Sequence, residues 1–401
     1  RPKDKELYKK LDAIVIDEIS MVRADLLDCV DVFMRKHGRK KGMPFGGAQM
    51  IFVGDLYQLP PVVTSREKDL FKHHYKGPYF FNSRLFDEDL FSNVSGGSAL
   101  FEMEFIELEK VYRQADGRFL NILNAIRNNT VTADDIAELN KRCAPDFKEK
   151  PDDFFIYLTT TNQLAETMNS AKLAEIDDEE YIYHGETEGD FEARSLPTLP
   201  ELTLKVGAQV MLLNNDTSGR WINGSIGRIK DIEESNDGPD ILWVELSDGE
   251  AVDVTPFKWE MYEFSYDKKA SKILSESVGS FTQYPLRLAW AVTIHKSQGM
   301  TFDRVVMDIG RGTFSHGQLY VGLSRCTSID GLVLRQPVDK RHVLLDWRVV
   351  GFVTRWQYRQ AEKGLSLKER TDMINEAIQR KKKLEIVYLK AKDEKTKRLG
   401  S

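Results

Sequence analysis

Two short apolar runs near the start of the chain each end in turn or acidic residues. Residues 11–18 read Leu-Asp-Ala-Ile-Val-Ile-Asp-Glu, and residues 50–55 read Met-Ile-Phe-Val-Gly-Asp. Apolar runs of this length predict buried parallel strands, and the helical pattern at 22–36 joins them into a β-α-β unit. Because ligands bind at the carboxyl ends of strands in doubly wound sheets, we expect both acidic ends to face one site.

A second α/β unit is predicted further along the chain. A run of small residues at 92–98 precedes an apolar strand around 105–108, and another strand is expected at 154–158, before residues 159–162 (Thr-Thr-Thr-Asn) and a helix. Between these strands, residues 118–128 predict an amphipathic helix. Its apolar side carries Phe119, Ile122, Leu123 and Ile126.

The pattern changes to short β-type runs between about 208 and 264. Runs at 209–213, 241–246 and 251–254 are separated by Asn-Gly, Asp-Gly and Gly-Pro turn signals. The α/β pattern resumes at 286–294 and at 304–309. A small β-barrel inserted into the second α/β unit accounts for this order, and the alternative is a long β-hairpin arm.

Composition places the chain among globular proteins. Its 401 residues are 41% hydrophobic and 30% charged, which fits two or three compact units with cores of their own. No apolar stretch approaches the length of about 18 residues that spans a bilayer, and the first residues lack the apolar core of a signal peptide. The composition therefore excludes disordered, fibrous and membrane-spanning proteins.

Cysteine spacing and net charge narrow the classes further. Cys29, Cys143 and Cys326 lie far apart, which argues against a disulfide framework or a cysteine zinc cluster and fits a reducing cytosol. The 57 Lys and Arg against 63 Asp and Glu give a net charge of -6. This balance argues against a polybasic binder, although a local DNA-binding groove is compatible with it.

The paired carboxylates Asp17 and Glu18 suit a site for a nucleotide with Mg²⁺. The first could hold the metal, and the second could orient and deprotonate an attacking water. The alternative is two solvated carboxylates at the end of a strand. Residues 54–62 (Gly-Asp-Leu-Tyr-Gln-Leu-Pro-Pro-Val) favour the site, because Gln58 can both donate and accept a hydrogen bond near a γ-phosphate and the two prolines stiffen its loop.

Five motifs follow one another in the order of a known family. They are 17–21 (Asp-Glu-Ile-Ser-Met), 54–62, 111–114 (Val-Tyr-Arg-Gln), 293–301 (Thr-Ile-His-Lys-Ser-Gln-Gly-Met-Thr) and 320–325 (Tyr-Val-Gly-Leu-Ser-Arg). Together they resemble the helicase core of superfamily one, in its 5′-to-3′ branch. The likeness is strongest to the Pif (petite integration frequency) DNA helicases, with the RecD-type helicases as relatives, and it covers 11 to about 334.

The resemblance implies an α/β fold of two RecA-like P-loop NTPase lobes with a small SH3-like β-barrel insert in the second. It implies ATP and Mg²⁺ as cofactors, with Asp17 on the metal and Glu18 activating water. Gln58 would read the γ-phosphate, and Arg113 and Arg325 would act as arginine fingers, which suits guanidinium forks. The nucleotide-binding residues also include Gly54, Asp55 and Gly299. For either arginine the alternative is a surface ion pair.

The resemblance also implies contacts with single-stranded DNA and with duplex or forked DNA. Lysine and hydroxyl side chains can meet phosphates, whereas His295 could equally be a packed structural histidine and the 159–162 loop an ordinary helix N-cap. Trp221 and Trp243, in the insert, could stack on bases or fill its core. The expected DNA-contacting residues are Thr159, Thr160, Asn162, Thr293, His295, Lys296, Ser297 and Thr301.

The chain departs from the family at both ends. No G-x-x-x-x-G-K-[ST] loop occurs in it. We therefore expect the first lobe to be truncated, an N-terminal segment to be missing and the 401 residues to be inactive alone. Helicase-like ATP turnover by these residues would refute this expectation.

At the other end, a capping box at 366–369 and a strand at 384–389 resemble the start of a WYL domain. The alternative is a basic helical tail packed on the core.

These patterns predict four domains. They are 1–103 for the first lobe, 104–207 with 285–350 for the second, 208–284 for the barrel insert and 351–401 for a helical extension. The expected function is ATP-dependent translocation 5′ to 3′ on single-stranded DNA and duplex unwinding, in DNA repair or in genome or telomere maintenance. We expect an intracellular monomer, in the bacterial cytosol or nucleoid, without membrane contact. The alternatives are a RecD-like subunit of a nuclease-helicase complex and a non-catalytic single-strand-binding module.

Overall fold

The computed structural model describes most of the chain, in two compact units. The described residues are 5–64, 66–86, 103–108, 111–114, 116–150, 153–192, 195–270, 272–310, 312–313, 315–364, 371–372, 375–376 and 379. The first unit comprises 1–21, 29–60 and 110–344, and the second comprises 22–28, 61–109 and 345–401. This division differs from the four predicted domains, whose boundaries stay a prediction.

The first unit begins with the predicted β-α-β arrangement. Strands β1 (Ala13–Ile16) and β2 (Gln49–Phe52) pair in parallel, and α2 (Ala24–His37) lies between them in the chain. The prediction of buried strands is wrong for the described structure. The side chains alternate, so that Val15 is 62% exposed and Ile51 is 41% exposed, because only one face of each strand is covered by described residues. The short elements here are α1 (Lys5–Tyr8), η1 (Ile19–Met21) and η2 (Pro44–Gly47).

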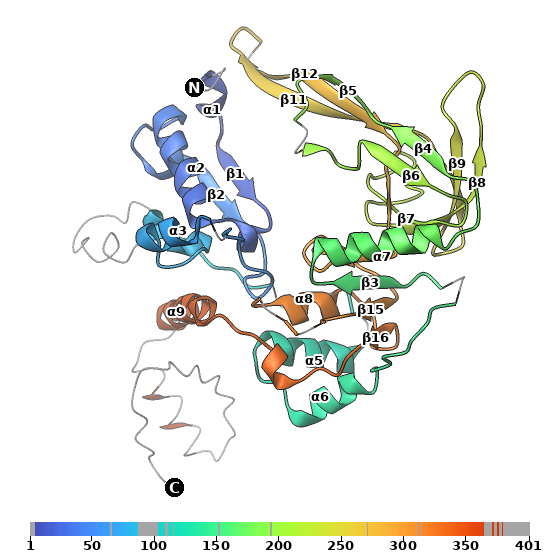
Figure 1. Ribbon diagram of the computed structural model, residues 1–401. Coiled ribbons are helices and arrows are strands. Elements are labelled where there is room, and N and C mark those ends of the chain that lie inside the picture. The colour runs from blue at the N-terminus through green and yellow to red at the C-terminus, as the bar shows by residue number, and fades with distance from the viewer. Residues whose placement is uncertain are drawn as a thin grey trace. The chain divides into compact units, whose positions relative to one another are not determined.

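A four-stranded parallel sheet forms the second predicted α/β unit. Its order is β14-β3-β15-β16, and α7 (Asn162–Ala174) lies along β3 and β14 (Figure 1). The strands are β3 (Ile156–Thr159), β14 (Ala291–Thr293), β15 (Val305–Met307) and β16 (Leu332–Leu334). The predicted strand at 154–158 is confirmed, and it starts two residues later and ends one residue later than expected. Since β3 and β14 are parallel neighbours, the loops that follow them lie at the same edge.

The predicted amphipathic helix is confirmed as α5 (Gly117–Arg127). The carboxylate of Asp116 caps its N-terminus, and all four residues of its predicted apolar side are buried. They pack in one core with β3 and α8 (Gln318–Ser324), and each such side chain contributes about 1.5–3 kcal/mol when fully buried. Also in this region are α6 (Ala133–Asn140) and η6 (Lys340–His342).

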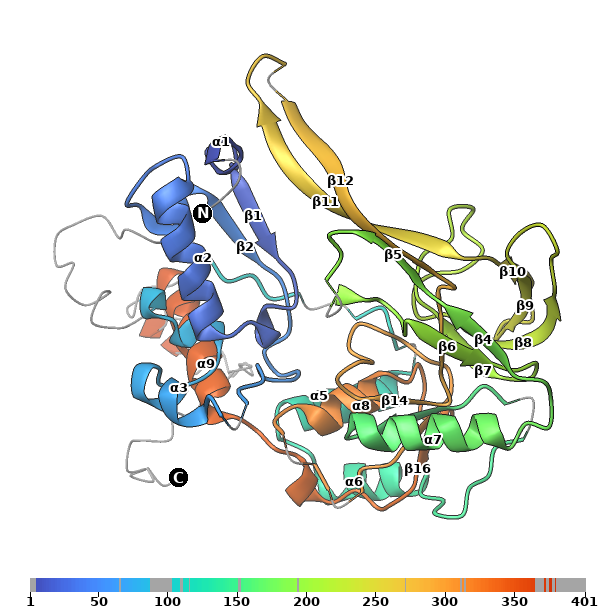
Figure 2. The same cartoon turned by 45° about the horizontal axis from the view of Figure 1, so that its top comes forward.

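The β-rich insert contains both a sheet and a long hairpin. The sheet has the order β10-β9-β8-β7-β13, and the hairpin of β11 and β12 pairs near its base with β5 (Figure 2). The 286–288 segment belongs to this sheet and not to the parallel one, because β13 pairs with β7. The strands are β4 (Tyr181–His184), β5 (Glu186–Gly189), β6 (Glu201–Leu204), β7 (Gln209–Leu212), β8 (Ile226–Glu233), β9 (Ile241–Leu246), β10 (Ala251–Val254), β11 (Phe257–Asp267), β12 (Lys272–Gln283) and β13 (Leu286–Leu288).

The second unit is built around aromatic packing. Phe352 of α9 (Trp347–Gly364) stacks on Phe81, with ring centroids 4.3 Å apart, and Tyr79 stacks on Phe81 from the same segment of chain. The Phe81 ring therefore joins α9 to the 79–81 segment. The other elements of this unit are α3 (Lys68–His74), η3 (Phe80–Asn82) and η4 (Arg84–Phe86).

Some predicted elements are wrong or lie outside the described residues. The strand expected around 105–108 is not formed, and Ile106 and Leu108 are 75% and 88% exposed, since no described strand pairs with this segment. The small-residue run at 92–98, the capping box at 366–369 and the strand at 384–389 lie outside the described residues.

Candidate active site

The predicted carboxylates lie directly after β1. Residues 17–21, which we call the carboxylate loop, begin where the strand ends, and the Ile19 amide donates to the Val53 carbonyl at 2.9 Å. An oxygen of Asp17 accepts from the Glu18 amide at 2.8 Å. Glu18 has a φ of +48°, in the left-handed region that side chains rarely adopt. The loop therefore holds Glu18 by its backbone as well as by its contacts.

Glu18 contacts a residue that is 280 positions away in sequence. The amide nitrogen Nε2 of Gln298 donates to Oε2 of Glu18 at 2.9 Å. Gln298 belongs to residues 293–301, which we call the Lys296 loop, after β14. Its own oxygen, Oε1, is buried and has no hydrogen-bond partner among the described residues. The two predicted motifs are thus brought together by a direct side-chain contact.

A second loop, residues 54–62, which we call the Gln58 loop, follows β2. Oδ1 of Asp55 accepts from the Tyr57 amide at 3.0 Å, and Oδ2 lies 3.5 Å from Nε2 of Gln58. Leu59 is fully buried in the core that contains α5 and α8. The loop is therefore fixed by an internal hydrogen bond and by a hydrophobic anchor in the second lobe.

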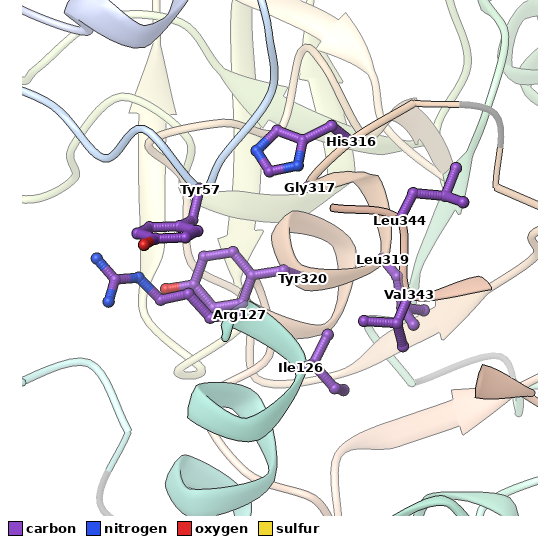
Figure 3. A pocket seen from close by; sticks show the side chains of 9 residues that line it. All are labelled: Tyr57, Ile126, Arg127, His316, Gly317, Leu319, Tyr320, Val343 and Leu344. Carbon is purple, nitrogen blue, oxygen red and sulfur yellow. The ribbon is translucent and has the colours of Figure 1, made fainter. Parts of the chain in front are cut away.

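Arg127, the last residue of α5, closes on the Gln58 loop. Its Nη2 lies 3.3 Å from Oδ1 of Asp55, and its guanidinium lies 4.5 Å from the centroid of the Tyr57 ring (Figure 3). Burial would lower the pKa of Arg127, but the charge of Asp55 and the hydrogen bond to Asp55 outweigh it and raise the pKa. Arg127 therefore stays charged in a half-buried position.

Tyr320, His316 and Gly317 complete this cluster from the start of α8. Burial and the charge of Asp55 raise the pKa of Tyr320 to about 12. Nε2 of His316 lies 3.2 Å from the Leu56 carbonyl oxygen, and Gly317 has a φ of +71°. The cavity that these residues line with Arg127 measures about 10 Å³, no more than one water molecule needs (Figure 3). It is a packed junction and not a ligand pocket.

Arg325 is 1% exposed and is bonded mainly to backbone. Its guanidinium donates to the carbonyls of Val321 at 2.9 Å and Met300 at 3.1 Å, and to the Ser324 hydroxyl at 2.9 Å. Burial and the positive charge of Arg113 lower the pKa of Arg325 to about 10, so it remains protonated at neutral pH. The guanidinium thus ties α8 to the Lys296 loop.

The Val-Tyr-Arg-Gln segment contacts the same helix. Nε2 of Gln114 donates to the Ser324 carbonyl at 3.0 Å and to the Cys326 carbonyl at 3.3 Å. Arg113 is half-buried, and no hydrogen bond or ion pair joins it to another described residue. The charge of Arg113 acts on Arg325, and so do the charges of Glu18 and Asp55.

Three of the predicted DNA-contacting hydroxyls are buried and used inside their loops. The Ser297 hydroxyl donates to the Ile294 carbonyl at 2.9 Å, and the Thr293 hydroxyl accepts from the Lys296 amide at 3.2 Å. The Thr159 hydroxyl donates to the Thr161 carbonyl at 3.2 Å. Short hydroxyl side chains in tight turns commonly bond their local backbone in this way.

The other predicted contacts are accessible at the same sheet edge. Lys296, Thr301 and Asn162 are exposed, and Thr160 and His295 are half-buried. Burial lowers the pKa of His295, so the ring is neutral at pH 7. The predicted N-cap is present beside them, since the Thr161 hydroxyl accepts from the Leu164 amide at the start of α7.

The two tryptophans of the insert have different environments. Trp221 is 7% exposed in the core of the five-stranded sheet region, and its Nε1 donates to Asn214 at 3.0 Å. Trp243 is 37% exposed and donates to Glu233 at 3.3 Å. Of the two alternatives, Trp221 fills the core, whereas Trp243 lies at the surface.

Comparison with known proteins identifies the family. The model of the PIF1-like helicase family matches residues 1–88, and that of the UvrD-like helicase C-terminal domain matches residues 288–328. The ATP-dependent DNA helicase Pif1 of Bdellovibrio bacteriovorus is 32% identical over 373 residues, which are 90% of this chain and 73% of that protein. The chain belongs to the PIF1-like helicase family.

Solved structures of this family support the fold. Bacteroides sp Pif1 in complex with ADP-AlF4 has a TM-score of 0.77 and 33% identity, over 88% of this chain and 77% of that chain. Bacteroides Pif1 bound to ssDNA has a TM-score of 0.62 and 33% identity, over 89% of this chain and 78% of that chain. The α/β fold with RecA-like lobes is confirmed, and the SH3-like form of the insert stays a prediction.

Sequence reasoning missed several residues that contact the predicted site, among them Gln298 and Arg127. Gln298 lies inside a recognised motif, but no role was predicted for it, and Arg127 ends a helix that is recognisable only by its apolar side. Among the described residues no three His, Cys, Asp or Glu side chains gather as a metal cluster. The described helices include none with the length and apolar character to span a membrane.

Proposed function

We propose that this chain contains the hydrolytic and strand-contacting residues of an ATP-dependent DNA helicase that moves 5′ to 3′ on single-stranded DNA. The observation that carries the proposal is the bond between Gln298 and Glu18. It joins the loop of the candidate catalytic base to the loop that contains Lys296. A movement of the DNA strand at the Lys296 loop would therefore be passed directly to the carboxylate of Glu18.

Asp17 would hold Mg²⁺ at the end of β1. A single protein carboxylate fits this ion, because Mg²⁺ is usually bound through one or two carboxylates together with substrate phosphates and water. Bound with ATP, Mg²⁺ would neutralise charge on the phosphate oxygens during phosphoryl transfer. Asp17 fits this role because its side chain is exposed and only one of its oxygens is held by the loop, by the Glu18 amide.

Glu18 would orient the attacking water and take its proton. Gln298 holds Oε2, which leaves Oε1 as the oxygen to accept the proton. Gln58 would contact the γ-phosphate from the neighbouring strand end, and Gly54, Asp55 and Gly299 would shape the surrounding loops.

Arg113 and Arg325 would stabilise negative charge on the transferred group. Their guanidinium groups stay protonated at neutral pH and match phosphate oxygens. Arg325 would have to exchange its bonds to the Met300 and Val321 carbonyls for bonds to phosphate. That exchange would release one link between α8 and the Lys296 loop at the moment of hydrolysis.

DNA would be held mainly through its phosphates, at the edge where β3 and β14 end. Lys296, Thr301, Asn162, Thr160 and His295 are the accessible groups, whereas Thr159, Thr293 and Ser297 would support the loops and offer backbone amides. The likeness to Bacteroides Pif1 bound to ssDNA supports this assignment. We propose forked or duplex DNA as the substrate, a monomer as the acting form, and a role inside the cell in DNA repair or genome maintenance.

Replacing Glu18 by glutamine tests the proposal. Glu18→Gln in the full-length protein should lower ATP turnover by at least about 100-fold, because the amide cannot accept the proton, while affinity for oligo(dT) stays within about threefold. Unwinding of a forked duplex with a 5′ tail should be lost.

A matched control comes from the other end of the same strand. Asp12 precedes β1 and is 82% exposed, so Asp12→Asn removes a carboxylate without approaching the site. It should leave ATP turnover unchanged. Turnover that survives Glu18→Gln would refute the assignment of the base, and unwinding only from a 3′ tail would refute the direction.

A further inference from the structure

Asp55 is committed to partners within the protein. Its Oδ1 accepts from the Tyr57 amide and faces Arg127, and its Oδ2 faces the side-chain amide of Gln58. Only 20% of its side chain is exposed. Both oxygens are therefore already used inside the Gln58 loop, and a direct contact with a nucleotide would cost these bonds.

Arg127 supplies the charge that keeps Asp55 in place. It reaches Asp55 from the last turn of α5, and its guanidinium plane is supported by the ring of Tyr57. A guanidinium in such a position offers a directional fork, which the point charge of lysine does not reproduce. Removing it would leave a partly buried carboxylate without its cation, and Gln58 would lose the fixed partner of its amide.

The surroundings leave this cluster little freedom. Leu59 anchors the Gln58 loop in the same core as the apolar side of α5. On the other side, a Cβ atom on Gly317 would lie 2.4 Å from the Gln58 carbonyl oxygen, so α8 begins in contact with the loop backbone. With a cavity of only about 10 Å³ at this junction, a shift of α5 or α8 must move the loop.

We propose that Arg127 is a positioning residue for ATP hydrolysis, which acts through Asp55 to hold the Gln58 side chain in its γ-phosphate-sensing orientation. This inference rests on the proposed function of Gln58. In this inference, Asp55 supports the Gln58 side chain. The α5 helix, which packs on the parallel sheet that carries the Lys296 loop, then links that sheet to the orientation of Gln58.

The test compares variants of Arg127 with a control on the same helix, in the full-length protein with oligo(dT). Arg127→Ala should lower kcat for ATP hydrolysis about 10–100-fold, while KM and the Kd of mant-ADP, a fluorescent nucleotide, change less than about threefold. Arg127→Lys should recover only part of kcat. Arg118→Ala removes an exposed arginine of α5 that pairs with Glu138, and it should leave kcat unchanged.

A double-mutant cycle separates positioning from general loosening. As a single substitution, Gln58→Ala should lower kcat. In the Arg127→Ala background it should lower kcat by less than about a further threefold, since both changes remove the same interaction. Effects of the two substitutions that multiply would overturn the inference, as would Arg127 variants that lose thermal stability but keep kcat.

Arg127→Lys replaces Arg127→Ala in these measurements if Arg127→Ala does not fold. A fall in kcat with Gln58→Ala but not with the Arg127 variants would refute only the inference, whereas no effect of Gln58→Ala would refute the proposed role of Gln58.

Discussion

Glu18 combines an unusual backbone conformation with a long-range side-chain contact. A residue with a side chain gives up about 1–2 kcal/mol in the left-handed region, and at Glu18 the φ of +48° coincides with the bond from Gln298. Positive-φ residues that persist at candidate sites are held by the surrounding structure. The conformation turns the carboxylate of Glu18 toward the Lys296 loop, which is what a coupled hydrolytic base requires.

Arg325, which was predicted to act as an arginine finger, is buried in the protein interior. Its guanidinium bonds to the carbonyls of Val321, Ser297 and Met300 and to the Ser324 hydroxyl. A truncation would leave these acceptors without their donor, at about 1–3 kcal/mol for each buried group. A variant of Arg325 can therefore lose folding stability, or lose stabilisation of charge in the transition state. Comparing a variant that keeps the buried cation with one that removes it distinguishes the two effects.

We expect Arg325→Ala to abolish unwinding in the full-length protein. Its affinity for single-stranded DNA should change less than about threefold, because Arg325 is buried while Lys296 and its accessible neighbours remain. Arg325→Lys keeps a buried cation and should fold, yet it should still lower ATP turnover by about 100-fold or more, since it lacks the fork. Fluorescence anisotropy and a forked-duplex assay measure the two effects, and retained unwinding in either variant would contradict the assignment.

At the scale of residues, sequence reasoning located the carboxylates and loops but not their contacts. Asp17 and Glu18 are recognisable because an apolar strand ends in them. The partner of Glu18 is Gln298, and a contact across 280 positions depends on how β1 and β14 are brought together, which no local pattern records. Thr293 and Ser297 were predicted to meet phosphate, but a tight turn gives their hydroxyls nearer partners in its own backbone.

At the scale of elements, Asp346 fixes the N-terminus of α9. The amide of Arg348 donates to Oδ1 of Asp346 at 2.9 Å, and the Tyr79 hydroxyl donates to Oδ2 at 2.9 Å. Burial would raise the pKa of Asp346, but the hydrogen bonds from Arg348 and Tyr79 outweigh it and hold the pKa below its ordinary value. Asp346 therefore both caps the helix and joins it to the aromatic cluster.

Acid should weaken the second unit through Asp346. Because folding lowers the pKa of this carboxyl group, the ionised form stabilises the folded protein at any pH above the ordinary value of 3.8, and the contribution is lost as pH falls further toward the folded pKa. Asp346→Ala should cost about 1–3 kcal/mol at pH 7, because it removes the cap and leaves the Tyr79 hydroxyl without its acceptor.

Thermal unfolding between pH 3 and pH 7 measures this effect. Asp346→Asn keeps a capping oxygen without the charge, so its stability should depend less on pH below about pH 4 than that of the unsubstituted protein. Asp134→Asn, at an exposed position in the first turn of α6, is the control and should keep the original pH dependence. Identical acid limbs for Asp346→Asn and the unsubstituted protein would contradict the role given to Asp346.

Element prediction succeeded where periodicity and burial agree. The α5 helix was predicted from an apolar side at helical spacing, and the structure confirms it and adds Asp116 as its N-cap. The strand predicted around 105–108 failed because apolar residues alone do not make a strand without a partner. In the insert, the structure contains the long β11–β12 hairpin together with a five-stranded sheet, and the barrel form of that sheet stays a prediction.

For the whole molecule, the net charge of -6 conceals how charge is distributed. Acidic residues follow β1 and β2, whereas exposed Lys296 lies at the edge where β3 and β14 end. DNA affinity should then depend on a few phosphate contacts and not on overall attraction. Because phosphate contacts release counterions, binding of DNA is expected to weaken as the salt concentration rises.

Lys296 should account for about one of these phosphate contacts. Lys296→Ala should weaken binding of oligo(dT) and should reduce the slope of log K against log salt by about 0.7, the value for one contact with a single strand. Lys148 is also exposed and lies in the segment before β3, not in a loop after a strand end, so Lys148→Ala should leave the slope unchanged. Fluorescence anisotropy at several salt concentrations distinguishes the two, and equal slopes would remove Lys296 from the DNA-binding set.

The absence of a side chain at Gly317 limits how this sequence can vary. A methyl group there would collide with the backbone of Tyr57 and Gln58, which no rotamer change relieves, and the φ of +71° disfavours every other residue. A variant at this position would touch neither nucleotide nor DNA, yet it would displace the proposed sensor of the γ-phosphate. A clinical or evolutionary survey that scores substitutions by distance from the ligands would therefore pass over one of the least replaceable positions in the chain.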